Sequence, residues 1–160
     1  MNTRLLVLAI ALPIIFFDRI TKVWAEGNLE FGRPEEVIGS LLQFNLVYNP
    51  GAAFSILTDA TWVFTVFATG FTIFVISFAH RIETLPWKIA AGMGLGGAVG
   101  NLIDRMINPP AIGQGHVIDF LMIPYWPIFN IADSSMTLAV VLIMLASLRG
   151  IDYKKSNESA

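Results

Sequence analysis

Long apolar segments alternate with short charged ones along this chain. The clearest apolar segment covers residues 60–79, carries no charge, and lies between Asp59 and His80. A helix rises about 1.5 Å per residue, so about twenty residues cross a hydrocarbon layer of about 30 Å. Residues 85–103 and 128–148 reach a similar length once flanking apolar residues and the flexible stem of Lys88 are included. The pattern therefore predicts three membrane-spanning helices after residue 60.

The N-terminal apolar run, residues 5–17, is followed by Asp18, Arg19 and Lys22 and then by further apolar residues. A helix over residues 5–25 with charges near one end accounts for this pattern. A secretory signal peptide is the alternative, because it also combines an early basic residue with an apolar run and a small-residue cleavage site. Three charges between the run and such a site favour a retained helix.

The distribution of basic residues predicts the orientation of these helices. Six lie on the side of the termini: Arg4, Arg81, Lys88, Arg149, Lys154 and Lys155. Four lie on the other side: Arg19, Lys22, Arg33 and Arg105. The side richer in Lys and Arg is normally cytoplasmic, so we expect both termini there. The sequence thus predicts a single integral membrane domain over residues 1–160.

Two longer connections fall on the opposite, extracytoplasmic side. Residues 42–49 alternate apolar and polar positions and end at the turn signal Asn49-Pro50-Gly51, which is typical of a short strand. Residues 105–127 contain four prolines, which disfavour regular helix before Ile128. The predicted fold class is therefore an all-α membrane protein, with four transmembrane helices and a small extracytoplasmic β hairpin or cradle and loop.

Composition narrows the possible chemistry. The chain is 55% hydrophobic and 14% charged, against about 25% charged in soluble domains. Its formal net charge of -2 offers no basic surface for nucleic acid, so we expect no such partner. It has no cysteine, which excludes disulfides, thiolate metal sites and a thiol nucleophile. No H-E-x-x-H motif occurs either, so we expect neither a metal nor another cofactor.

Several ionisable residues fall within the predicted helices, where charge is costly and usually functional. Asp18 and Lys22 are four residues apart and share a helix face, either as a structural pair or as a contact to substrate. Asn101, Asp104 and Arg105 share a face near the outer end of another helix. Arg105 would bind carboxylates or lipid phosphates, or extend to the membrane interface.

The same helix carries Gly92, Gly96 and Gly100 at four-residue spacing. Such a stripe lets another helix backbone, or a ligand, approach closely. Helix packing is the favoured interpretation.

Two aspartates are the strongest candidates for catalysis. Asp119 lies in an apolar segment, and Asp133 opens the last helix, where Asn130 and Asp133 could act as N-caps. Pro124 and Pro127 between them are expected to fold the chain back, so that both aspartates meet at the outer edge of the bilayer.

Two carboxylates in contact do not both ionise readily, so one keeps its proton. This arrangement supplies a general base for water and a general acid for a leaving amine, as in aspartic proteases. His80 and His116 are isolated and no G-x-S-x-G motif occurs, so no serine triad competes. Membrane carboxylates also form proton relays, so a proton or ion transporter is the alternative function.

Five short motifs follow one another in the chain and together resemble the lipoprotein signal peptidases, the type II signal peptidases of bacteria. They are Asp18-Arg19-Ile20-Thr21-Lys22, Asn49-Pro50-Gly51-Ala52-Ala53-Phe54, Gly96-Gly97-Ala98-Val99-Gly100-Asn101-Leu102-Ile103-Asp104-Arg105, Val117-Ile118-Asp119-Phe120 and Phe129-Asn130-Ile131-Ala132-Asp133.

The resemblance implies a multi-pass enzyme of the bacterial cytoplasmic (inner) membrane with its active site near the outer leaflet. It implies cleavage of prolipoproteins just before a cysteine that already carries diacylglycerol, with Asp119 and Asp133 as the catalytic pair. The other polar motif positions would orient the pair and the substrate or hold the site together: Asp18, Lys22, Asn49, Asn101, Arg105 and Asn130. The expected partners are diacylglyceryl-prolipoprotein substrates and membrane lipids, and we expect a monomer.

Overall fold

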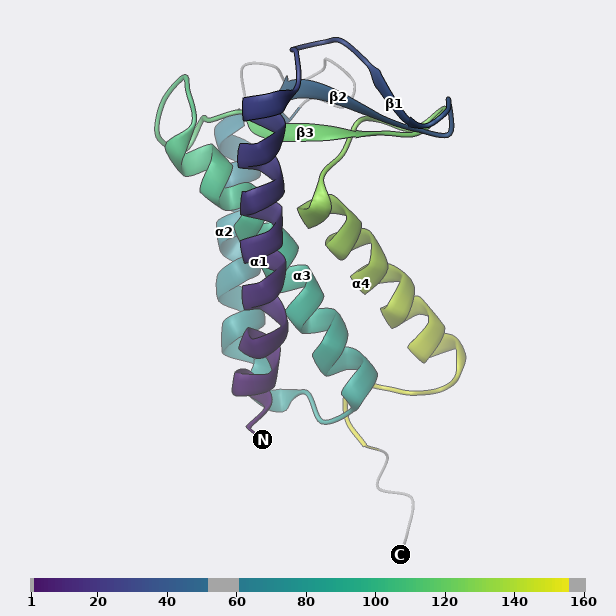
Figure 1. Cartoon of the computed structure of the whole chain (residues 1–160). Coiled ribbons are helices and arrows are strands. Elements are labelled where there is room, and N and C mark those ends of the chain that lie inside the picture. Colours follow the sequence, from purple (N-terminus) through teal and green to yellow (C-terminus); the bar gives the residue numbers. More distant parts are fainter. Residues whose placement is uncertain (1, 52–60, 156–160) are drawn as a thin grey trace, which may run out of the picture.

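The computed structural model describes residues 2–51 and 61–155. Four α-helices account for most of these residues: α1 (Thr3–Asn28), α2 (Thr61–Phe78), α3 (Leu85–Ile107) and α4 (Ile131–Leu148). A short 3-10 turn, Ala79–Arg81, extends α2. Three strands complete the fold: β1 (Glu35–Ile38), β2 (Leu42–Asn49) and β3 (Val117–Met122). Figure 1 shows the strands across one end of the helices, with the beginning of α1 and the end of α4 at the opposite end.

Helix α3 lies at the centre and packs against α1, α2 and α4. Its glycines make these approaches possible: a Cβ on Gly92 would lie 2.7 Å from Cβ of Ile10, and one on Gly96 would lie 2.9 Å from Cβ of Ile14. Real side chains do not approach so closely, so these positions admit only glycine without a shift of α1. The packing interpretation of the glycine stripe is confirmed.

The sheet is antiparallel with the order β1-β2-β3. Strand β2 confirms the strand expected over residues 42–49. The expected hairpin was incomplete, however, because a third strand comes from the proline-containing connection between α3 and α4. Strand β3 is buried along Val117–Phe120 on both faces, so it has no apolar-polar alternation by which the sequence could reveal it.

A small apolar cluster attaches the sheet to the end of α1. It consists of Ala25, Leu29, Leu46, Ile118 and Phe120. A separate cluster fills the helical bundle near its other end: Val7, Ala11, Val75, Ala79 and Leu95. The sheet is therefore fixed to the helices by a core of its own, which gives β3 a defined position above α3 and α4.

The helices lie where the spans were predicted, with shifted ends. The span at residues 60–79 begins at Ala60, outside the described residues, and α4 begins at Ile131 instead of residue 128. Phe129 pairs with Leu121 of β3, which keeps the preceding residues out of the helix.

Two of the described helical segments are long and apolar enough to cross a membrane by length and composition: Thr61–Arg81 and Ile131–Leu148. Helices α1 and α3 carry more charged residues, several of them buried near the sheet. That all four helices cross the membrane remains a prediction.

Candidate active site

Asp119 is held at the centre of β3 and is almost completely buried. In the register between β2 and β3, Val47 pairs with Asp119 and Asn49 with Val117, so Asn49 lies diagonally across from Asp119 on the same face. The Asn49 side-chain amide donates a hydrogen bond of 2.8 Å to Asp119 Oδ2, and Asn130 donates one of 2.6 Å to Asp119 Oδ1. Both carboxylate oxygens of Asp119 therefore have an amide donor.

Asp133 lies in the first turn of α4 and is partly exposed. It forms a capping box with Asn130: the Asp133 N–H donates to Asn130 Oδ1 at 2.9 Å, and the Asn130 N–H donates to Asp133 Oδ2 at 3.2 Å. Asn101 of α3 donates a bond of 2.7 Å to Asp133 Oδ1. The predicted capping and the predicted fold-back of the chain are both confirmed, the latter by the antiparallel bridge between Leu121 and Phe129.

One buried side chain, Asn130, joins the two aspartates. Its amide nitrogen donates to Asp119, while its backbone N–H and its side-chain oxygen bond to Asp133. The same amide nitrogen lies 3.0 Å from Asn101 Oδ1 and 3.3 Å from the Ile118 carbonyl. Any rotation of Asn130 would thus disturb both carboxyls, which makes it the rigid link of the site.

A fully buried ammonium lies behind the aspartates. Lys22 Nζ contacts Asp18 Oδ2 at 2.8 Å, Asp104 Oδ2 at 2.7 Å and Asn101 Oδ1 at 2.9 Å. An ammonium has three hydrogens, and all three find acceptors inside the protein. The predicted pairing of Asp18 with Lys22 is confirmed, and the complete set of partners favours its structural interpretation.

The two acids around Lys22 also bind the backbone that carries the aspartates. Asp18 Oδ1 accepts the Ala132 N–H at 2.9 Å, and Asp104 Oδ2 accepts the Ile118 N–H at 3.2 Å. Each of these amides belongs to the residue immediately before one of the two aspartates. Arg19 adds a second cation beside Asp104, at 3.4 Å. The charged cluster therefore fixes α4 and β3 relative to α1 and α3.

Arg105 lies beside this network with donor capacity to spare. Its Nη1 donates to the Asn101 carbonyl at 3.2 Å, and its guanidinium lies over the Phe64 ring, 5.8 Å from the centroid. Its Nε is buried and has no hydrogen-bond partner among the described residues. The observed contacts of Arg105 are thus with protein groups at the site, and its role in binding substrate remains a prediction.

Burial sets the charge state of Asp119. Loss of solvent, and to a smaller extent the charge of Asp133, raise the pKa of Asp119 from its ordinary value to about 7. The hydrogen bonds from Asn49 and Asn130 and the charge of Lys22 act in the opposite direction. Asp119 can therefore hold a proton near neutral pH, and the charge of Asp133 disfavours the ionised form of Asp119.

The structure brings the predicted site residues into one cluster at the sheet end of the bundle. Three of the supporting residues bond directly to Asp119 or Asp133: Asn49, Asn101 and Asn130. Lys22 and Arg105 bond to Asn101. Asp18 bonds to the backbone N–H of Ala132, the residue before Asp133. The sequence did not place Asp104 in the site, although its helix face, shared with Asn101, was a usable signal. Ala52, Ala53 and Phe54 of the second motif lie outside the described residues. No group of three His, Asp or Glu side chains suited to a metal occurs within residues 2–51 and 61–155.

Comparisons with known proteins agree on one family. Residues 10–149 match the family model described as Signal peptidase (SPase) II. The lipoprotein signal peptidase of Rhodococcus jostii is 41% identical over 149 residues, covering 93% of this chain and 75% of the relative. That of Mycobacterium leprae is 43% identical over 148 residues, covering 92% and 74%. A solved structure described as a bacterial membrane enzyme has a TM-score of 0.81 at 32% identity, covering 96% of this chain and 94% of the other. This chain therefore belongs to the signal peptidase II family and is a protease.

Proposed function

We propose that this protein removes the signal peptide from diacylglyceryl-modified prolipoproteins by cleaving just before the lipidated cysteine, with Asp119 and Asp133 as an aspartic dyad. The observation that carries this proposal is the bridge made by Asn130, which bonds to both carboxyls at once. Family membership supports the substrate class. The partial exposure of Asp133 supports access for water and a peptide.

In this mechanism water is bound between the two carboxyls. Asp133, as the ionised member of the pair, takes a proton from the water while the water oxygen attacks the scissile carbonyl carbon. Asp119 donates its proton to the amide nitrogen as the carbon-nitrogen bond breaks. The raised pKa of Asp119, about 7, supports this division of roles because a general acid must hold its proton near the working pH.

Arg105 is the best candidate to stabilise the oxyanion. The side-chain amide nitrogens of the three asparagines, Asn49, Asn101 and Asn130, already donate to the aspartates. Arg105 keeps a buried Nε without a partner among the described residues, and its positive charge suits a developing negative oxygen.

The distribution of apolar side chains supports a bundle that spans the membrane. Exposed large apolar residues occur along α1, α2 and α4, for example Leu12, Phe67 and Met144. Such surfaces suit lipid tails. We assign the sheet end to the extracytoplasmic side and both termini to the cytoplasm, which puts the dyad near the outer leaflet of the bacterial inner membrane.

The test is a cleavage assay in detergent with a diacylglyceryl-modified precursor and the same precursor without the lipid. The proposal predicts a new amino terminus at the modified cysteine and little or no product from the unmodified precursor. A transporter built on the same carboxylates would instead give proton flux in liposomes and no new amino terminus. That second outcome would overturn the proposal.

A further inference from the structure

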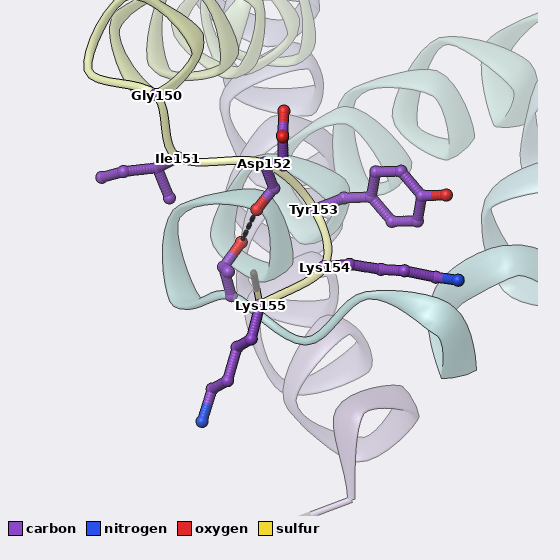
Figure 2. A pocket seen from close by; sticks show the side chains of 7 residues that line it. Gly150, Ile151, Asp152, Tyr153, Lys154 and Lys155 are labelled. Atoms are coloured by element: carbon purple, nitrogen blue, oxygen red, sulfur yellow. Dashed lines mark hydrogen bonds between the residues drawn. The ribbon is translucent and has the colours of Figure 1, made fainter. Parts of the chain in front are cut away.

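The chain after α4 does not leave the bundle but returns to it. Residues 150–155, which we call the C-terminal strap, lie against the connection between α2 and α3. The Tyr153 carbonyl accepts the Glu83 N–H at 2.7 Å, the Asp152 carbonyl accepts the Thr84 hydroxyl at 2.7 Å, and the Ile151 carbonyl accepts the Trp87 indole N–H at 2.8 Å. The dashed line in Figure 2 marks the bond to Asp152.

Aromatic contacts hold the strap in the same place. The Tyr153 ring lies 5.5 Å from the Phe78 ring and 6.1 Å from the Trp87 ring, measured between centroids. Tyrosine and tryptophan are enriched where a membrane meets water, because each has an apolar body and one polar group. Tyr153 of the strap and Trp87 of α3 are thus residues typical of a membrane surface, and they lie in contact.

Basic side chains dominate this end of the molecule. The described ones are Arg4, Arg81, Lys88, Arg149, Lys154 and Lys155. Glu83 and Asp152 are the acidic side chains among the described residues there. Figure 2 shows Lys154 extending on the side of the Tyr153 ring and Lys155 extending the other way, while the Asp152 carboxylate points away from both. The strap residues and Thr84 also line a cavity of about 600 Å³.

From these contacts we infer that the C-terminal strap, with Lys154 and Lys155, is a binding surface for the head groups of anionic phospholipids in the cytoplasmic leaflet. The bonds to the α2–α3 connection already order the backbone of the strap, so binding a lipid does not require that ordering. Each basic residue close to an anionic membrane surface contributes about 1 kcal/mol, which is about a fivefold change in binding. This inference depends on the proposed orientation of the helices but not on the dyad.

The test measures which lipids co-purify with the full-length protein from mixed micelles of phosphatidylglycerol and phosphatidylcholine in equal amounts. We expect enrichment of phosphatidylglycerol, and about a fivefold lower enrichment in Lys154→Gln and in Lys155→Gln. Asp152→Asn is expected to raise the enrichment because it removes the carboxylate of the strap. Arg33→Gln is the matched control, since it removes one exposed positive charge at the sheet end.

Equal recovery of both lipids by the unmodified protein would overturn the inference, as would an equal loss in Arg33→Gln and Lys154→Gln. Displacement of phosphatidylglycerol by glycerol phosphate in solution would also overturn it, because the site would then recognise a free phosphate and not a membrane. Cleavage is recorded on the same samples. A protein with intact lipid preference but no cleavage contradicts the proposed function alone.

Discussion

Replacement of Lys22 by methionine tests whether the buried charged cluster stabilises the fold around the site. Methionine keeps the length of the side chain but removes the ammonium, which lies 2.7–2.9 Å from three acceptors and is fully buried. Asp18 and Asp104 would lose their shared counter-charge, and Asp104 would keep the weaker ion pair with Arg19, at 3.4 Å.

Removing one partner of a buried ion pair costs about 3–5 kcal/mol. For a domain of this size, each kcal/mol lowers the unfolding midpoint by about 2–4 °C, so the expected decrease is about 6–20 °C. The assay is thermal unfolding in detergent micelles. Adding Asp104→Asn to Lys22→Met should recover part of the loss, because it removes one of the uncompensated carboxylates.

Arg33→Met is the matched control. Arg33 and Glu30 form an ion pair at 2.7 Å, the same distance as that between Lys22 and Asp104, but both side chains are 69% exposed. Water and salt screen such a pair, so its removal should leave the midpoint almost unchanged. Equal midpoints for Lys22→Met and Arg33→Met would refute the assignment of a stabilising role to the buried cluster.

Three further predictions concern the dyad and its supports. Because burial raises the pKa of Asp119 to about 7, the unfolded chain releases this proton at lower pH than the folded protein does, so folding stability should fall between about pH 4 and pH 7. Cleavage should decline above about pH 7, where Asp119 loses its proton. Unfolding midpoints of Asp119→Asn that fall just as steeply from about pH 4 to pH 7 would contradict this prediction. Asn101→Leu removes the hydrogen-bond donor to Asp133. A hydrogen bond to a charged group is worth about 1.5–3 kcal/mol, so kcat should fall about 10- to 150-fold. An unchanged kcat would contradict a role for Asn101 in supporting catalysis. Gly97→Ala should reduce cleavage and stability, because the added Cβ would collide with the Ala132 carbonyl and with Met136 Cγ. In the control variant Gly70→Ala the added Cβ meets no described atom within 4 Å, so the unfolding midpoint should stay equal or rise. Equal midpoints and equal cleavage rates for the two variants would contradict this packing argument.

The sequence was informative wherever a contact is local or a pattern is one-dimensional. The uncharged run now seen as α2 predicted a helix because no other element of that length suits an apolar environment. The spacing of Asp18 and Lys22 predicted their pairing because a helix fixes the geometry of residues four apart. Asn130 and Asp133 predicted the start of a helix, because a cap is formed by residues close together in the sequence.

Contacts between distant parts of the chain could not be predicted from these patterns. Asp18 accepts the backbone N–H of Ala132, and Asp104 accepts that of Ile118. A backbone amide has no side-chain signature, so nothing in the sequence marks either residue as a partner. Strand β3 was missed for a related reason, since burial on both faces removes the alternation that reveals a strand.

The most direct test of the central claim is single-turnover cleavage of a diacylglyceryl-modified precursor by Asp119→Asn and by Asp133→Asn, each in parallel with its unfolding midpoint. Each change leaves a side chain of nearly the same shape but removes one proton carrier, and each acid or base role is worth about 10² to 10⁴ in rate. We predict that both variants remain folded and that the cleavage rate of each falls by at least about 10². Cleavage at the rate of the unmodified protein by either folded variant would contradict the aspartic dyad.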